Sequence, residues 1–244
     1  LLDKMCDPAK EILELAKRYK ITHAVDFTFP EINAWQKAKA LIESGRFGSL
    51  QNISVNWQWL AGDIKNKITS WKTKVKDGGG ILSLYFSHGL YYLEYFAGPI
   101  ANIHSLFTHA PESLGGAESG IDLSIVFKNG VTANAHVHGN YRGTPRHQII
   151  FQCTKGVIAL ENKNAIVDNF VLATLTEGEE TVKNIPFKKE KVVHGEDSRA
   201  KIARKPIARF VKACLEKKQT FPSFHEGVRV QMLIEQARAH RLKK

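Results

Sequence analysis

The chain has 244 residues, of which 43% are hydrophobic and 24% charged, a composition typical of a soluble globular protein with one large domain, or with one domain and part of a second. No apolar run approaches the roughly 20 residues that span a bilayer, and no signal-peptide pattern stands at the start, so we expect no membrane span. The net charge is +11, with 12 Lys/Arg against 4 Asp/Glu between Lys183 and Lys218, but no zinc-finger, homeodomain or aromatic-basic RNA motif accompanies it. We therefore predict a solvated helical face or a surface that attracts acidic substrates, and no nucleic-acid partner.

Helices and one strand are predicted before residue 50. Apolar residues at helical spacing predict a helix over 8–20, and a short strand over 21–29 ends at Pro30. A second helix is predicted over 30–48, with Gly45 as its C′ residue.

From Leu50 the apolar pattern changes to the alternation of half-buried strands. Strands are expected over 50–61, 101–110, 121–141, 146–162 and 165–187, with turns at Asn129-Gly130, Lys155-Gly156 and Glu177-Gly178. A glycine-led helix over 78–98 interrupts them, and helices over 198–218 and 225–244 close the chain. This order predicts an α+β fold: an open, mostly antiparallel β-sheet with helices on one face.

Cys6, Cys153 and Cys214 are far apart and odd in number. This argues against a disulfide framework and favours a reducing compartment, so we expect a cytoplasmic protein. The opening "LLDKMCDP" has no initiator methionine, and we interpret the chain as the remainder of a longer polypeptide.

Three stretches together resemble the Gfo/Idh/MocA family of NAD(P)-dependent oxidoreductases, which act mainly on sugars and cyclitols. "DFTFPEINAWQKAKALIESGRFGSLQNISVNW" is similar to the segment by which that family enters its second domain, "SWKTKVKDGGGILSLYFSHGLYYLEYFAGPI" to its active-site helix, and "CTKGVIALEN" to a strand-turn-strand before the last helices. The resemblance covers essentially the whole chain from about residue 3 onward.

The resemblance implies the domain organisation, the cofactor and the assembly. Residues 1–26 would be the last helix and strand of a Rossmann domain, and residues 27–244 a dihydrodipicolinate-reductase-like C-terminal domain that binds substrate and forms oligomers. No G-x-G-x-x-G occurs in the chain, so NAD or NADP would be bound mainly by an absent N-terminal half. A homodimer or homotetramer would form through the sheet, since an exposed apolar sheet face marks an interface.

Family members carry an aspartate and, four residues later, a histidine on the active-site helix, together with a lysine from a Glu-Lys-Pro motif. His88 matches the histidine, whereas Leu84 stands in place of the acid. Lys4 would be the catalytic and cofactor-binding lysine, although Met5 replaces the proline. An imidazole suits proton transfer to or from a substrate hydroxyl near neutral pH.

Further residues are candidates for contact with the substrate. The Gly78–Gly80 run permits positive φ and a close backbone approach, so Gly79 and Gly80 are predicted at the cleft. Tyr85 or Tyr92 would donate a hydrogen bond in place of the lost carboxylate, although such an aromatic stripe is more often core. The remaining candidates are Ser87, Trp71 and Lys72, with Trp57 and Trp59 as either a sugar platform or packing.

His136 and His138 lie on one strand face at a spacing that can bind zinc. Nothing in the sequence selects a third ligand from among His104, His109 and His147, so we predict sheet-surface histidines and no metal site. The predicted function is the substrate domain of an NAD(P)-dependent oxidoreductase for a sugar or sugar-like alcohol. The alternative is a non-catalytic binding or scaffolding module, which Leu84 and Met5 favour.

Overall fold

The computed structural model describes residues 3–113, 115–163, 169–191, 193–197 and 199–242. Its centre is an open eight-stranded sheet in the order β2-β3-β4-β1-β5-β6-β7-β8. The strands are β1 (Leu50–Gln58), β2 (Ile100–Thr108), β3 (Gly120–Phe127), β4 (Thr132–His138), β5 (Arg146–Cys153), β6 (Gly156–Asn162), β7 (Val171–Thr176) and β8 (Lys183–Asn184). The predicted α+β fold with an open, mostly antiparallel sheet is confirmed.

One strand pair departs from the antiparallel pattern. β1 runs parallel to β4, with Asn52 opposite Thr132 and Gln58 opposite His138, and antiparallel to β5 on its other side. The alternation of Ile53, Val55 and Trp57 with polar residues predicted β1 correctly. The alternation of apolar and polar residues indicates which side chains share a face of the sheet, but it does not identify the neighbouring strand. This parallel pair was therefore not predicted.

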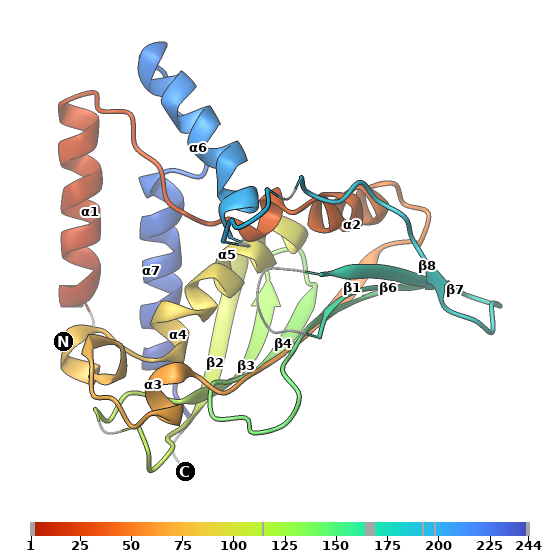
Figure 1. The fold of residues 1–244 in the computed structure, drawn as a ribbon, viewed down its shortest axis with the longest axis horizontal. Coiled ribbons are helices and arrows are strands. Elements are labelled where there is room, and N and C mark those ends of the chain that lie inside the picture. The colour runs from red at the N-terminus through yellow and green to blue at the C-terminus, as the bar shows by residue number, and fades with distance from the viewer. Residues whose placement is uncertain (1–2, 114, 164–168, 192, 198, 243–244) are drawn as a thin grey trace.

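Helices cover one face of the sheet (Figure 1). They are α1 (Asp3–Arg18), α2 (Asn33–Glu43), α3 (Gly62–Lys65), α4 (Ile81–Leu84), α5 (Phe86–Ala97), α6 (Ala200–Leu215) and α7 (Phe224–Ala239). α1 packs against α7, which contacts α5 and β2. Trp35 of α2 and Leu90 of α5 are fully buried between this layer and the sheet. No helix in the described ranges is long and apolar enough to cross a membrane.

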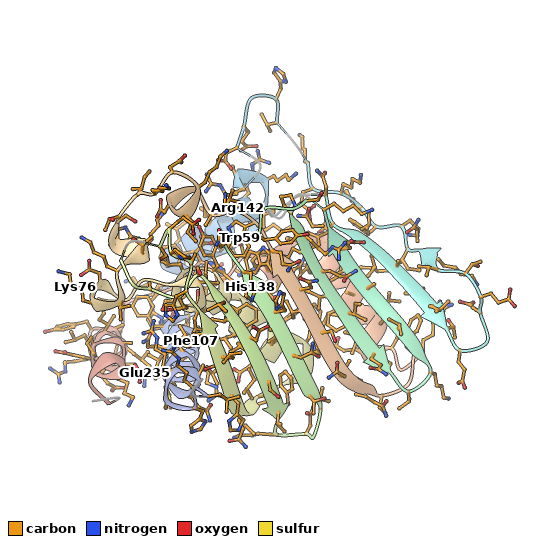
Figure 2. The ribbon with its side chains drawn as sticks, turned by 90° about the horizontal axis from the view of Figure 1, so that it is seen from below. Trp59, Lys76, Phe107, His138, Arg142 and Glu235 are labelled. Atoms are coloured by element: carbon orange, nitrogen blue, oxygen red, sulfur yellow. The ribbon has the colours of Figure 1, made fainter. Side chains whose placement is uncertain are left out.

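The opposite face of the sheet is uncovered, and over β1 and β4 it is polar. Ser54, Asn56 and Gln58 of β1 point to this side, and Ser54 Oγ donates a hydrogen bond to Asn134 Oδ1 of β4 at 3.1 Å. Figure 2 looks onto this face, with His138 labelled on it. The homo-oligomer through the sheet stays a prediction.

The strand predicted over 21–29 is also absent. Residues 21–28 lie outside the sheet, and Val25 N–H donates to Pro222 O at 3.1 Å in the loop before α7. A strand requires a neighbouring strand to pair with its backbone, and the described residues offer none here. The other elements were predicted within a few residues, although residues 165–168, 198 and 243–244 of three of them lie outside the described ranges.

Candidate active site

The three glycines before α4 are required for three different reasons. Gly78 has φ 77°, a left-handed conformation that ends the 3₁₀ turn Val75–Asp77. A Cβ on Gly79 would overlap the carbonyl oxygens of Trp71 and Lys72. Gly80 combines φ 117° with close contact to the Glu118 carboxylate. The loop is therefore tightly packed against neighbouring backbone and side-chain atoms and is not a flexible linker.

We expect Gly79→Ala to lower the free energy of unfolding by about 1–3 kcal/mol, because the new methyl group must displace main-chain atoms and not a mobile side chain. Urea denaturation measures this loss. Gly62→Ala is the matched control, since a Cβ at Gly62 meets no atom within 4 Å and its φ is ordinary. An equal effect of both substitutions would contradict the close backbone contact at Gly79.

A buried carboxylate fixes the start of α4. Glu118 is 7% exposed, its Oε1 accepts a hydrogen bond from Leu82 N–H at 3.2 Å, and its backbone carbonyl accepts one from Ile81 N–H at 3.1 Å. Burial raises the pKa of Glu118, although the nearby hydrogen bonds and Arg238 oppose this. From α7, Arg238 Nη2 donates to Ser83 Oγ at 2.7 Å. The Glu118 and Arg238 side chains together hold the helix that leads to His88.

A cavity of about 150 Å³ lies where the glycine loop, α3 and α4 meet. Its lining residues are Ala61, Gly62, Asp63, Ile64, Lys72, Thr73, Gly80, Ile81, Leu84, Tyr85, Ser113 and Glu118. The structure thus brings together the predicted residues Gly80, Lys72 and Tyr85. A carboxylate, an ammonium and a phenol around a small cavity can bind a polyhydroxylated molecule by hydrogen bonds.

Helix geometry changes at Tyr85, between α4 and α5, where φ is −111°. The Tyr85 ring packs on Trp59 at 4.8 Å between centroids. Burial, and secondarily the charge of Asp63, raises the pKa of the Tyr85 phenol. The phenol is therefore protonated at neutral pH and available as a hydrogen-bond donor in the cavity.

The carboxylate of Asp63 lines the same cavity as Leu84. Its Oδ2 accepts a hydrogen bond from Ser70 Oγ at 2.9 Å. Sequence analysis did not select this residue, because the family pattern places the acid at position 84 and no local spacing links Asp63 to the helix.

His88 lies in α5, one helical turn beyond Leu84, and is half-buried. Its ring meets Phe27 and Phe29 edge-on, at 5.6 and 5.9 Å between centroids, and it does not line the cavity. Its Nδ1 is buried without a hydrogen-bond partner among the described residues. Burial lowers the pKa of His88, and the charge of Asp26 offsets part of this. The imidazole is therefore neutral near pH 7 and can accept a proton.

Tyr92 and Trp57 belong to the core instead of the site. Tyr92 is fully buried, with its hydroxyl 3.4 Å from His147 Nε2, and Trp57 is 5% exposed and stacks on the His147 ring. The expectation that Tyr92 donates to a substrate is therefore wrong in this structure. The helical wheel identified the face but not that the sheet covers it at this point.

The remaining predicted residues are not gathered around the cavity. Trp71 is 55% exposed and Ser87 is half-buried, and neither contributes to the lining. Gly79 is buried directly beside the cavity residue Gly80. The backbone of Lys4 belongs to α1, but the prediction for its side chain lies outside what the structure describes.

The described residues do not form a dinucleotide site. Such a site uses a glycine-rich turn between a strand and a helix of a parallel βαβ unit. The parallel pair here, β1 and β4, is not joined by such a turn, and the glycine run Gly78–Gly80 follows a 3₁₀ turn and not a strand. The described residues therefore form no binding site for NAD or NADP.

Comparisons with known proteins agree with this fold. Residues 35–159 match the family model described as the GFO/IDH/MocA C-terminal domain. No curated protein sequence matches the chain significantly. A levoglucosan dehydrogenase, in complex with NADH and levoglucosan, superposes with a TM-score of 0.80 at 16% identity, over 96% of this chain and 68% of that chain.

Two further solved structures are similar. WlbA dehydrogenase from Bordetella pertussis, in complex with NADH and UDP-GlcNAcA, has a TM-score of 0.72 at 15% identity, over 96% of this chain and 65% of that chain. Aldose-aldose oxidoreductase from Caulobacter crescentus, complexed with glycerol, has a TM-score of 0.76 at 13% identity, over 96% of this chain and 66% of that chain. At these identities the likeness establishes a shared fold.

Proposed function

Because the chain belongs to the GFO/IDH/MocA family, with residues 35–159 in its C-terminal domain, we propose that it binds the substrate of an NAD(P)-dependent oxidoreductase. The substrate class is a sugar or sugar-like alcohol or ketone. Levoglucosan and UDP-GlcNAcA in the complexes of two similar structures support this class. NADH in the same complexes supports a nicotinamide cofactor.

The observation that carries the proposal is a neutral imidazole one turn from a polar cavity. Oxidation of an alcohol requires a base for the hydroxyl proton, and the reverse reaction requires an acid at the same place. Burial lowers the pKa of His88, so its neutral imidazole can act as that base for a substrate hydroxyl that extends from the cavity toward α5. Its packing between aromatic rings fixes the ring orientation.

The cavity residues bind and orient the substrate in this proposal. Tyr85 donates a hydrogen bond from its protonated phenol, and Asp63 accepts hydrogen bonds from sugar hydroxyls in place of the acid that Leu84 replaces. Lys72 contributes a positive charge that favours acidic sugars. Trp59, packed against Tyr85 with its ring tilted, keeps the phenol in position. Trp71, exposed beside Lys72, would stack on a sugar ring.

The test is an assay with NAD and with NADP against a panel of sugars, sugar acids and cyclitols. The protein assayed is this chain joined behind a dinucleotide-binding domain of the family, because the described residues form no site for the cofactor. We expect substrate-dependent formation of the reduced nicotinamide with at least one pair, because the cavity and the neutral imidazole are both present. Absorbance of the reduced cofactor measures it. No reduction with any pair would reject the oxidoreductase proposal.

A second candidate function is a sugar-binding module without chemistry. Leu84 favours it, because an aliphatic wall residue can neither accept a proton nor orient an imidazole. Thermal-shift measurements with the same sugars distinguish the two functions. A rise in the melting temperature without any reduction of cofactor would support the module.

A further inference from the structure

Three potential metal ligands meet on the uncovered face of the sheet, away from the candidate active site. His136 and His138 are two residues apart on β4, so their side chains share a face, and Asp122 of β3 lies opposite His136 in the antiparallel register. One ligand atom from each of the three residues lies within 4.8 Å of the other two. The sequence predicted the histidine pair, and the strand register supplies the third group.

The contacts within the cluster show that the side chains converge. His136 Nδ1 lies 2.6 Å from Asp122 Oδ1, and His138 Nε2 lies 3.5 Å from Asp122 Oδ2. The two imidazole rings are stacked with centroids 4.1 Å apart. His138 Nε2 is buried and has no hydrogen-bond partner in the described part of the chain. This nitrogen faces the Asp122 carboxylate and is available as a ligand atom.

The backbone beside the cluster is shaped to hold His138 there. Gly120, the residue opposite His138 on β3, has no side chain, and a Cβ at this position would overlap His138 Nδ1 and Thr108 Oγ1. The imidazole therefore lies across β3 toward Asp122. A larger residue at position 120 would push the ring away from the carboxylate.

We propose that Asp122, His136 and His138 bind a divalent transition-metal ion, Zn²⁺ first among them. Two imidazoles and one carboxylate suit zinc, whereas Mg²⁺ and Ca²⁺ prefer oxygen ligands alone. Ligand atoms bound to Zn²⁺ at about 2.0–2.1 Å lie roughly 3.3 Å apart in a tetrahedron, so small side-chain rotations close the site.

The site leaves a coordination position toward solvent. The side chains of Asp122 and His136 are 41% and 44% exposed, and that of His138 is 23% exposed. Three protein ligands with an open fourth position are typical of zinc sites that bind water or an exogenous ligand. The bound ion would carry such a ligand on the open sheet face, on the other side of the sheet from the helix layer.

The experiment is calorimetric titration of the purified protein, free of any histidine tag, with ZnSO₄. We expect one ion per chain, and at least tenfold weaker binding in each of Asp122→Asn, His136→Gln and His138→Gln. The matched controls are His104→Gln and His240→Gln, which remove the neighbouring histidine pair whose rings are 5.5 Å apart. These two controls should bind Zn²⁺ as the wild type does.

A second measurement does not depend on any variant folding. Co²⁺ added to the wild-type protein should give the intense visible bands of a four-coordinate site, which Zn²⁺ then abolishes by displacement. The proposal is overturned if the wild-type protein shows no saturable one-to-one binding. It is equally overturned if the His104 or His240 substitution removes binding while the Asp122, His136 and His138 variants retain it.

Discussion

Replacing His88 by alanine is expected to lower kcat of the oxidoreductase at least tenfold, and by about 10²–10⁴-fold if its imidazole is the general base. The methyl group of alanine can neither accept nor donate the hydroxyl proton. The Km for the substrate should change much less, because His88 does not line the cavity that would hold the sugar. Steady-state kinetics with the best substrate from the panel measure both quantities.

The pH profile separates proton transfer from a purely structural role of His88. Burial lowers the pKa of this imidazole, so the wild-type rate should begin to fall only below the ordinary histidine value of about 6.5. That acidic limb should disappear in His88→Ala. His104→Ala, an exposed control on β2, should retain both the rate and the limb. Unchanged turnover in His88→Ala would reject the catalytic assignment of His88.

Local sequence patterns predicted most elements because each pattern has a local physical cause. The alternation in β1 and the left-handed glycine Gly45 after α2 both follow from backbone geometry within a few residues. The strand predicted over 21–29 failed for the opposite reason. Strand formation depends on a partner that the residue pattern does not identify, and here that segment packs against the loop before α7.

The candidate site was predicted only where its residues are close in sequence. His88, Tyr85 and the glycine run belong to one stretch, and their spacing placed them together. Glu118 reaches the start of α4 from 36 positions away in the sequence, so no spacing rule could have identified it. Asp122 joins His136 only through the register of β3 and β4. Charged residues that contact groups far away in the sequence can be identified only from the folded structure.

His147 gives the largest expected pH dependence of stability. It is fully buried, its ring stacks on Trp57 at 4.2 Å between centroids, and its Nε2 lies 3.4 Å from the Tyr92 hydroxyl. No carboxylate contacts it in the described chain, and burial lowers its pKa to about 3. The folded protein therefore keeps this imidazole neutral at pH values where an unfolded chain protonates it.

The direction of the effect follows from proton binding. Between about pH 6.5 and pH 3 the unfolded state binds up to one more proton at His147 than the folded state, so acid favours unfolding. The stability that neutral His147 contributes is complete above pH 6.5 and decreases as the pH falls. The slope should reach about 1.4 kcal/mol per pH unit, and the total loss by pH 3 about 5 kcal/mol.

The measurement is the free energy of unfolding in urea at several pH values from 7 to 4, for wild type and for His147→Phe. Phenylalanine can retain the stacking on Trp57 but cannot be protonated, so we expect a shallower decline with acid in this variant. The absolute stability of His147→Phe is irrelevant to this comparison, because only the slopes are compared. His194→Gln, at an exposed position, should retain the wild-type slope. Equal slopes in wild type and His147→Phe would mean that water reaches His147, or that this imidazole is already protonated, in the folded protein. The aromatic core around Trp57 and Tyr92 would then be open to solvent.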